Sequence, residues 1–449
     1  MNPFGFWQAG KEKPLLKDQA EIDRLYKKYR ISVMLAVTIG YGLAYPLRLA
    51  LSAVKKPLID GNIFSATELG AIGSALLYSY AFGKFFNGFL ADHANVKRFF
   101  ATGVLLSSLM NLLIWQSNIL WLWIIIWGLN GWFQGFGAPT GAVVLANWFS
   151  NRERGRMYGI WSTAHALGEG LTFIVSATLV AYFGWKAGFW APGLFCILVA
   201  VGIYFTLQDR PQTFGLPTIA VWKQDHTAES MKKETQSLKT LKVQLKIFKI
   251  PAIWILGLSS ALMYVTRYAI NSWGFLYLQE AKGYSLIEAG GILGLNTLAG
   301  IAGCVAYGFI SDKLFNARRP PVNLIFATIE VGALAVIFFM PPGHPILLTA
   351  AFVVYGFTLS GLLAALGGLF AIDIAPKKAA GAVMGFIGIF SYFGAGFQDQ
   401  ISGILIERGT TMIEGVRHYD FSSAIILWIG GSILSLILAA TLWRVKVSD

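Results

Sequence analysis

The segment ISVMLAVTIGYGLAYPLRLALSAV, residues 31–54, contains a single charged side chain, Arg48, in an otherwise apolar run. About 20 predominantly apolar residues in helical form are enough to cross the hydrocarbon core of a bilayer. An arginine near the middle of such a helix costs roughly 2.5–3.5 kcal/mol on insertion scales, so it needs a partner or a function. The segment therefore predicts a membrane-spanning helix that carries a functional polar residue.

Composition places the whole chain in the membrane class. Its 449 residues are 55% hydrophobic and 13% charged, with a mean hydropathy of +0.59. These values exclude an ordinary soluble enzyme. The formal charge of +13 comes from Lys and Arg in short runs between apolar stretches, which indicates cytoplasmic loops and anionic lipid rather than a nucleic-acid partner. Cys196 and Cys304 both lie in apolar segments, so we expect neither a disulfide framework nor a cysteine metal site.

We predict an all-α membrane protein with twelve transmembrane helices in two pseudo-symmetric six-helix halves. The expected spans are 31–54, 68–91, 99–117, 119–148, 157–182, 187–207, 251–279, 286–311, 322–341, 344–372, 381–406 and 420–444. They predict a cytoplasmic N-terminal segment (1–30), an N-terminal bundle (31–207), a cytoplasmic linker (208–250), a C-terminal bundle (251–444) and a cytoplasmic tail (445–449). No signal-peptide pattern precedes the first span, so we expect that span to be retained.

Basic residues predict the orientation of these spans. The loops that share one side with both termini hold Lys97, Arg98, Arg152, Arg154, Arg156, Lys313, Arg318, Arg319, Lys377 and Lys378. Because cytoplasmic loops are enriched in Lys and Arg, this side is predicted to be cytoplasmic. On the opposite side we assign Lys55 and Lys56 to a loop, together with a charge-balanced loop at 407–420. Residues 15–30 predict either an amphipathic helix on the membrane surface or a solvated helix.

An internal repeat relates the two halves. Tyr45-Pro-Leu-Arg48 recurs as Tyr264-Val-Thr-Arg267, and Gly88-Phe-Leu-Ala-Asp92 recurs as Gly308-Phe-Ile-Ser-Asp312. The offsets are 267 − 48 = 219 and 312 − 92 = 220. Two matches at nearly one offset indicate a parallel duplication, with a substrate path between the halves.

We single out six ionisable residues within the predicted spans as candidates for function: Arg48, Lys84, His165, Glu169, Arg267 and Asp399. The repeat predicts that Arg48 and Arg267 face each other at equal depth. Two planar guanidinium groups can neutralise a phosphate dianion through charge-assisted hydrogen bonds. The alternative is that each arginine pairs with an internal carboxylate such as Glu169 or Asp399.

The other groups allow two interpretations each. Lys84 either adds charge to the same cavity or extends toward the membrane interface. His165 either contacts substrate or is a buried neutral histidine held by a local partner. Glu169 follows His165 by four residues, which places both on one helix face, and it and Asp399 could carry protons or hold arginines in the empty state.

Two further features are weaker signals. Asp92 and Asp312 each precede a basic pair, which indicates either charge pairing that locks cytoplasmic helix ends or the positive-inside pattern alone. Aromatic residues near the arginines are usually packing residues, although some could supply hydroxyl groups to a substrate; they are Tyr41, Tyr45, Tyr80, Trp161, Tyr264, Tyr268, Trp273 and Tyr392.

With these residues in view, the chain resembles the organophosphate:phosphate antiporter family of the major facilitator superfamily over nearly its whole length. The shared motifs include Gly40-Tyr41 through Arg48, Tyr80-Ala-Phe-Gly-Lys84, Trp132-Phe-Gln-Gly135, Arg152-Glu-Arg-Gly155, Trp161-Ser-Thr-Ala-His165, Tyr264 through Arg267, Ser311-Asp-Lys313 and Ala375 through Gly381. The similarity is strongest to the bacterial hexose-phosphate sensor and transporter branch. It implies that Arg48 and Arg267 bind phosphate, that His165 takes part in substrate binding and that Lys84 lies in the translocation pathway.

The resemblance implies a non-enzymatic antiporter of the bacterial inner membrane. It would exchange an organic phosphate, such as hexose phosphate or glycerol-3-phosphate, for inorganic phosphate, without cofactor or metal. The same features are compatible with a hexose-phosphate sensor that signals to a membrane kinase, or with a proton-coupled carrier of another organic anion. The chain departs from the family pattern at Leu49, Ala166, Glu169, Thr297 and Leu362, and these departures put the usual sugar phosphate in doubt.

Overall fold

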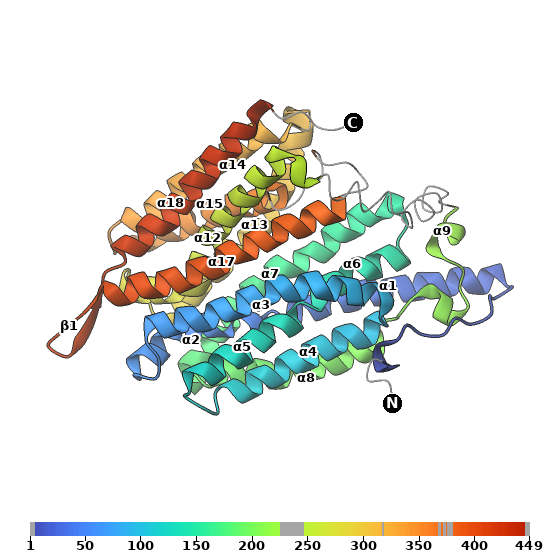
Figure 1. The fold of residues 1–449 in the computed structure, drawn as a ribbon, viewed down its shortest axis with the longest axis horizontal. Helices are drawn as coiled ribbons and strands as arrows, with labels where there is room; N and C mark the ends of the chain where they lie inside the picture. Colours follow the sequence, from blue (N-terminus) through green and yellow to red (C-terminus); the bar gives the residue numbers. More distant parts are fainter. Residues whose placement is uncertain are drawn as a thin grey trace.

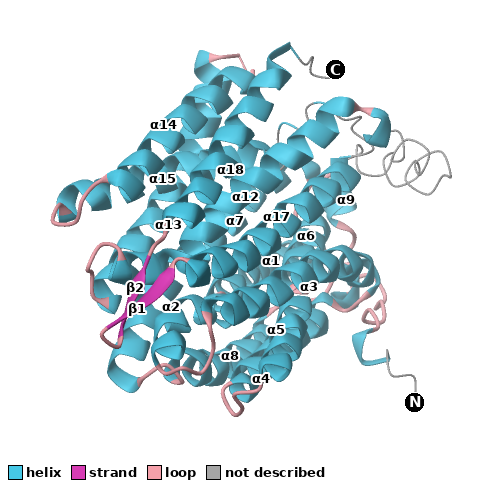
Figure 2. Cartoon of the chain, turned by 60° about the vertical axis from the view of Figure 1, so that its left-hand side comes forward, coloured by secondary structure: helices cyan, strands magenta, loops and turns pink. Residues whose placement is uncertain are grey.

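The computed structural model describes residues 5–224, 247–316, 318–366, 370, 374 and 380–444. Long helices make up most of it (Figures 1 and 2). The first half contains α1 (Gln19–Leu43), α2 (Pro46–Asp60), α3 (Ala66–His93), α4 (Val96–Ile114), α5 (Leu120–Gln134), α6 (Gly137–Trp148), α7 (Asn151–Phe183) and α8 (Ala187–Thr206). The second half contains α12 (Pro251–Glu280), α13 (Leu286–Phe309), α14 (Arg319–Phe339), α15 (Pro345–Ala364), α17 (Ala380–Arg408) and α18 (Ser422–Thr441).

Two of the predicted spans are broken into shorter helices. The first span divides between α1 and α2 because Pro46 has no N–H to continue the hydrogen-bond ladder. The span predicted at 119–148 divides between α5 and α6 at Gly135. A side chain there would bring Cβ to 2.7 Å from the carbonyl carbon of Gly83. Both breaks lie where helices of the first half approach one another closely.

The helices form two groups that pack against each other. In Figure 1 the blue to green helices of the first half lie below the yellow to red helices of the second. Helix α3 packs along α5, and α13 packs along α15, within their own halves. Between the halves, α3 packs along α17, α7 along α13, and α2 against α12. The residues that face this boundary therefore come from α2, α3, α7, α12, α13 and α17.

A β-hairpin marks one end of the molecule, opposite the end that holds both termini (Figures 1 and 2). Strands β1 (Thr410–Ile413) and β2 (Val416–Tyr419) pair antiparallel, with Thr410 opposite Tyr419. The turn between them has positive φ at Glu414 and Gly415. Arg417 donates hydrogen bonds to the carbonyl of Ile59 and to Asn62, so the hairpin of the second half is attached to the end of α2.

The N-terminal part of α1 packs against protein, which corrects both sequence-based interpretations of residues 15–30. Ile22 and Tyr26 are buried. The ring of Tyr26 stacks on Trp222 at 4.2 Å between centroids, and its hydroxyl donates to the carbonyl of Pro217 at 2.5 Å. Trp222 belongs to α9 (Ile219–Trp222), which follows η2 (Pro211–Phe214) after the first half. The apolar face of this helix is therefore covered by the chain that leaves α8.

Nine helical segments of the described chain are long and apolar enough to cross a membrane. The other predicted spans at 68–91, 119–148 and 381–406 correspond to α3, to α5 with α6, and to α17. The span predicted at 344–372 begins with α15, and its last part lies largely outside the described residues. The tail at 445–449 and most of the linker also lie outside them. The helices that line the boundary between the halves all lie within the described residues.

Candidate functional site

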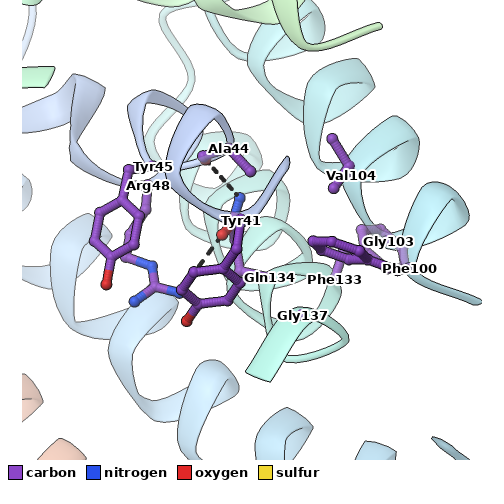
Figure 3. Close-up of a pocket in the computed structure, with 10 residues that line it drawn as sticks. All are labelled: Tyr41, Ala44, Tyr45, Arg48, Phe100, Gly103, Val104, Phe133, Gln134 and Gly137. Atoms are coloured by element: carbon purple, nitrogen blue, oxygen red, sulfur yellow. Dashed lines mark hydrogen bonds between the residues drawn. The ribbon is translucent and has the colours of Figure 1, made fainter. Parts of the chain in front are cut away.

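Arg48 lies in the first turn of α2, directly after the break that Pro46 imposes. It is 7% exposed, and its Nη2 donates to Oε1 of Gln134 at 3.5 Å. Figure 3 shows its guanidinium among the rings of Tyr41 and Tyr45, in a pocket that α5 and α6 also line. The Nε of Arg48 is buried and has no hydrogen-bond partner among the described residues. The guanidinium of Arg48 thus keeps unused donor capacity inside the protein.

Gln134 orients Arg48 from α5, and its importance was missed at the level of sequence. Its Nε2 donates to Ser107 Oγ at 2.8 Å and to the carbonyl of Ala44 at 3.5 Å. These bonds leave Oε1 to face the guanidinium. Gln134 lies within the Trp132-Phe-Gln-Gly135 motif, which was a signal for family but not for this contact.

Arg267 lies in α12 and pairs with a carboxylate from the other half. Its Nη2 donates to Glu169 Oε2 at 2.7 Å, and Asn271 Nδ2 donates to Glu169 Oε1 at 2.7 Å. Glu169 is 5% exposed. For Arg267 the predicted alternative of carboxylate pairing is therefore what the structure shows. A buried charge pair of this kind is costly to break by removing one partner, so Arg267 is compensated where Arg48 is not.

A chain of tyrosine rings joins the two arginines across the boundary. The Arg48 guanidinium lies 4.2 Å from the ring centroid of Tyr80 on α3, and Tyr80 contacts Tyr392 on α17 at 4.6 Å between centroids. Tyr392 contacts Tyr264 at 5.5 Å. The Arg267 guanidinium in turn lies 5.8 Å from the ring of Tyr264. The predicted site residues Arg48, Tyr264 and Arg267 thus belong to one continuous cluster.

Lys84 and His165 join the cluster at its edges. The Nζ of Lys84 lies 5.8 Å from the ring centroid of Tyr392, across the boundary between the halves. The ring of His165 contacts Tyr41 at 4.7 Å and Tyr45 at 6.0 Å, and its Nδ1 lies 3.2 Å from the carbonyl of Ser162. An Nδ1–H that donates to this carbonyl leaves Nε2 as the acceptor of the neutral ring. His165 therefore has the local partner of the second interpretation and also borders the predicted site.

Lys55 is not in a loop, which corrects the sequence-based assignment. It lies in α2, is fully buried, and donates to Asp399 Oδ1 at 2.9 Å and to Ser272 Oγ at 2.7 Å. Its Nζ lies 3.3 Å from the ring centroid of Trp273. The prediction is wrong because two adjacent lysines followed by Pro57 have the pattern of a span end, although the helix continues through them to Asp60. Their spacing from Arg48 along one helix was the signal that could have found Lys55.

Asp92 and Asp312 behave differently at the opposite end of the molecule. Asp312 accepts a hydrogen bond from Arg319 Nη1 at 2.9 Å within the second half. Asp92 is exposed at the end of α3 and forms no ion pair with any described residue. The predicted gating role of these acids remains a prediction.

Glu330 is a further buried acid, which the sequence analysis missed. It lies within the apolar run of α14 and is 2% exposed. A single acid inside such a run was its signal, by the same argument that selected Glu169. It belongs to the second half alone and does not join the arginine cluster.

Two groups of long apolar helices that enclose a buried cluster of arginines and tyrosines define a multi-pass membrane protein of the solute-carrier class. Comparison with known proteins identifies the class further. Residues 30–398 match the family model of the Major Facilitator Superfamily, and the chain belongs to that superfamily. The predicted fold class is confirmed. Membership in the organophosphate branch is also confirmed, since relatives of the chain are named as transporters of glycerol-3-phosphate and hexose phosphate.

Curated relatives cover most of the chain. The chain is 34% identical to "Membrane sensor protein UhpC" of Salmonella typhimurium over 87% of its length and 89% of that protein. It is 32% identical to "Glycerol-3-phosphate transporter" of Bacillus subtilis over 95% of both. It is 33% identical to "Probable hexose phosphate transport protein" of Chlamydia pneumoniae over 87% of this chain and 88% of that one.

A solved structure shows the same fold. A bacterial homologue of the human lysosomal transporter Spinster, in an inward-facing and unoccupied conformation, superposes with a TM-score of 0.76 over 94% of this chain and 99% of that one. The sequence identity is 16%, so this likeness concerns fold alone.

Proposed function

We propose that this protein exchanges an organic phosphate, such as hexose phosphate or glycerol-3-phosphate, for inorganic phosphate by alternating access. The observation that carries the proposal is the uncompensated guanidinium of Arg48, buried at the boundary between the halves and joined through tyrosine rings to Arg267. A guanidinium fork suits phosphate oxygens, and relatives that match most of the chain are named "Glycerol-3-phosphate transporter" and "Probable hexose phosphate transport protein".

The proposed binding residues are Arg48, Arg267, His165, Lys84, Tyr45 and Tyr264. Glu169, Asp399, Asp92 and Asp312 are proposed to act in gating or coupling. Substrate phosphate would compete with Glu169 for Arg267, since both are anions and Glu169 already occupies the guanidinium. Release of Glu169 would then couple occupancy of the site to movement of α7 against α12.

The proposed orientation places both termini and the linker in the cytoplasm of a bacterial inner membrane, with bundles at 31–207 and 251–444. Ion pairs that join described residues of the two halves are Arg267–Glu169, Lys55–Asp399 and Lys56–Glu280. All involve α2 or α12, and Lys56 and Glu280 lie near the hairpin end of these helices. This supports a state closed toward the hairpin, which would be the extracytoplasmic side.

Exchange in proteoliposomes tests the proposal. Vesicles loaded with unlabelled phosphate should take up labelled phosphate, and external hexose phosphate or glycerol-3-phosphate should compete. Uptake that needs an imposed pH gradient would instead indicate a proton-coupled carrier. Absence of exchange with a protein shown to be folded would contradict the proposal.

A sensor is the second candidate, because one relative at 34% identity is named as a membrane sensor. It would use the same arginines to bind hexose phosphate and would pass the signal to a membrane kinase. Saturable binding of labelled hexose phosphate without flux would favour it.

A further inference from the structure

A polar stripe continues beyond Arg48 along α2 toward the hairpin end. Arg48, Ser52 and Lys55 are separated by four and three residues, so their side chains lie on one helix face, a turn apart from each other. All three are buried. Buried charged residues such as Arg48 and Lys55 are costly in a membrane-spanning helix and indicate a function. Lys55 is not part of the cluster around Arg48 and Arg267, so that cluster does not explain it.

A second cavity lies along this stripe. It is lined by Arg48 and Ser52 from α2 and by Asn271, Ser272 and Asp399 from the second half. Gly73 of α3 also lines it, and a Cβ there would lie 1.8 Å from Asp399 Oδ2. Glycine at this position therefore gives the Asp399 carboxylate the room to reach Lys55.

Lys55 forms an ion pair with a carboxylate of the other half, that of Asp399. Its ammonium contacts Asp399 Oδ1 at 2.9 Å and Ser272 Oγ at 2.7 Å. Ser272 Oγ also donates to Asp399 Oδ1 at 2.8 Å. Lys55 belongs to the first half, whereas Asp399, Ser272 and Trp273 belong to the second. Any opening of this side of the protein must separate Lys55 from Asp399.

Separation leaves an ammonium group without a counter-ion, with Ser52 one turn away and Arg48 beyond it. Removing one partner of a buried ion pair is unfavourable unless another anion replaces it. A phosphate group that arrives from the hairpin side would meet Lys55 before Arg48. We propose that Lys55, with Ser52, forms an outer anion-binding subsite for the phosphate group of the entering substrate, and that Asp399 occupies this subsite when the hairpin side is closed.

This inference rests on the proposed function for its direction of transport, but it concerns a separate subsite. It predicts an effect on one side of the membrane only. In Lys55→Gln the KM for phosphate presented on the hairpin side should rise about tenfold, while the KM for phosphate on the opposite side stays within about twofold. Both are measured by exchange of labelled phosphate in vesicles of determined orientation.

A double variant separates anion binding from a simple latch. Lys55→Gln with Asp399→Asn replaces the ion pair by two amides and so leaves no uncompensated charge. If the pair only closes the protein, this variant should recover wild-type KM on both sides. If Lys55 binds the entering anion, the KM on the hairpin side should stay high. Recovery in the double variant overturns the inference.

Lys56→Gln is the matched control. Lys56 is the next residue along α2 and pairs across the boundary with Glu280, which does not line the cavity, whereas the Lys55 partner Asp399 does. Its loss removes an equal charge and an ion pair between the halves that is more exposed than the Lys55–Asp399 pair. We expect its KM on the hairpin side to remain within about twofold of wild type, and a rise equal to that of Lys55→Gln would also overturn the inference.

A binding measurement makes the test independent of flux. Ser52→Cys, in a background without Cys196 and Cys304, is labelled by a membrane-impermeant thiol reagent added on the hairpin side. Inorganic phosphate should slow this labelling, and the protection should disappear when Lys55→Gln is added. If the wild type shows no exchange, the proposed function fails while this measurement still decides the inference: protection independent of Lys55 contradicts it.

Discussion

Charge compensation distinguishes the two arginines at the scale of single residues. Arg267 is bound by Glu169, which Asn271 also holds. Arg48 instead faces the π surfaces of Tyr45 and Tyr80 and the amide of Gln134. Rings and an amide offset a positive charge less than a carboxylate does. Arg48 is therefore the stronger site for an incoming anion in the state that the structure shows.

Replacement of either arginine by lysine tests their role. Lysine keeps the charge but loses the planar fork that binds two phosphate oxygens, so we expect Arg48→Lys and Arg267→Lys to weaken phosphate binding at least about tenfold, roughly 1.4 kcal/mol. Equilibrium binding to purified protein measures this. Arg417→Lys, in the hairpin, is the control and should bind normally. Wild-type affinity in Arg48→Lys would remove the arginine from the site.

Neutralisation of Glu169 tests its competition with substrate. Glu169→Gln removes the charge with little change of shape, so Arg267 becomes free for phosphate and binding should tighten. Exchange should slow, because the empty carrier loses the ion pair that compensates Arg267 when the site reorients. Binding and exchange are measured on the same preparation.

The two readouts together decide the role of Glu169. Loss of pH dependence in exchange, without tighter binding, would indicate a proton carrier instead. Glu288→Gln is the control, because Glu288 accepts a hydrogen bond from the backbone of Ser285 at the start of α13, away from the cluster, and it should leave binding unchanged. A Glu169→Gln variant that matches wild type in every respect would contradict the gating hypothesis.

Close helix crossings position the site at the scale of elements. Helices α13 and α15 approach so closely that a Cβ on Gly303 would lie 1.8 Å from the carbonyl oxygen of Phe357. A Cβ on Gly356 would likewise lie 1.8 Å from the carbonyl oxygen of Asn296. Small residues at helix interfaces permit such packing in membranes. These crossings hold α13 and α15 together, and α12 packs against both helices.

Gly303→Ala tests this crossing and has a control on the same helix. The added methyl group must push α13 from α15, which we expect to cost about 1–3 kcal/mol and to lower the midpoint of thermal unfolding in detergent. At Gly308 a Cβ would meet no atom within 4 Å, so Gly308→Ala should be neutral or stabilising by up to about 1 kcal/mol. Equal midpoints for the two variants would show that the crossing is not tight.

The contacts that join the two halves differ between the hairpin end and the end that holds the termini. At the hairpin end Arg417 and Lys56 connect the second half to the first. Both termini lie at the other end (Figures 1 and 2). Alternating access requires the contacts at one end to open while those at the other close, so the hairpin end is the one that must open for the site to be reached from that side.

Cysteine labelling tests the orientation of the whole molecule. In a background without Cys196 and Cys304, a cysteine at Ser230 in the linker should react with an impermeant reagent only from the cytoplasmic side, since basic loops mark that side. A cysteine at Thr411 in the hairpin should react only from outside the cell. Labelling of both from one side would contradict the predicted topology, and exchanged sides would reverse it.

The sequence by itself determined the fold class, the positions of most spans and the candidates for the site. This was possible because lipid excludes uncompensated charge, so that each apolar run and each charge within it, such as Arg48 or Glu169, is visible in a single chain. The same reasoning applies to Glu330, a single acid within the apolar run of α14. The broken helices at Pro46 and Gly135 also had local signals, in a proline and a glycine.

Only the tertiary structure decided which charges pair. Glu169 and Arg267 are 98 residues apart, and Lys55 and Asp399 are 344 apart. The sequence placed Glu169, Arg267 and Asp399 inside the membrane and Lys55 outside it. It did not show which basic residue forms an ion pair with which acid. The choice follows from which helices pack at the boundary, where α2 lies against α12, α3 along α17 and α7 along α13, and from whether a neighbour such as Gly73 leaves room for the carboxylate. The energy of each ion pair depends on a distance of a few ångströms between the charged atoms. The amino-acid sequence does not specify these distances.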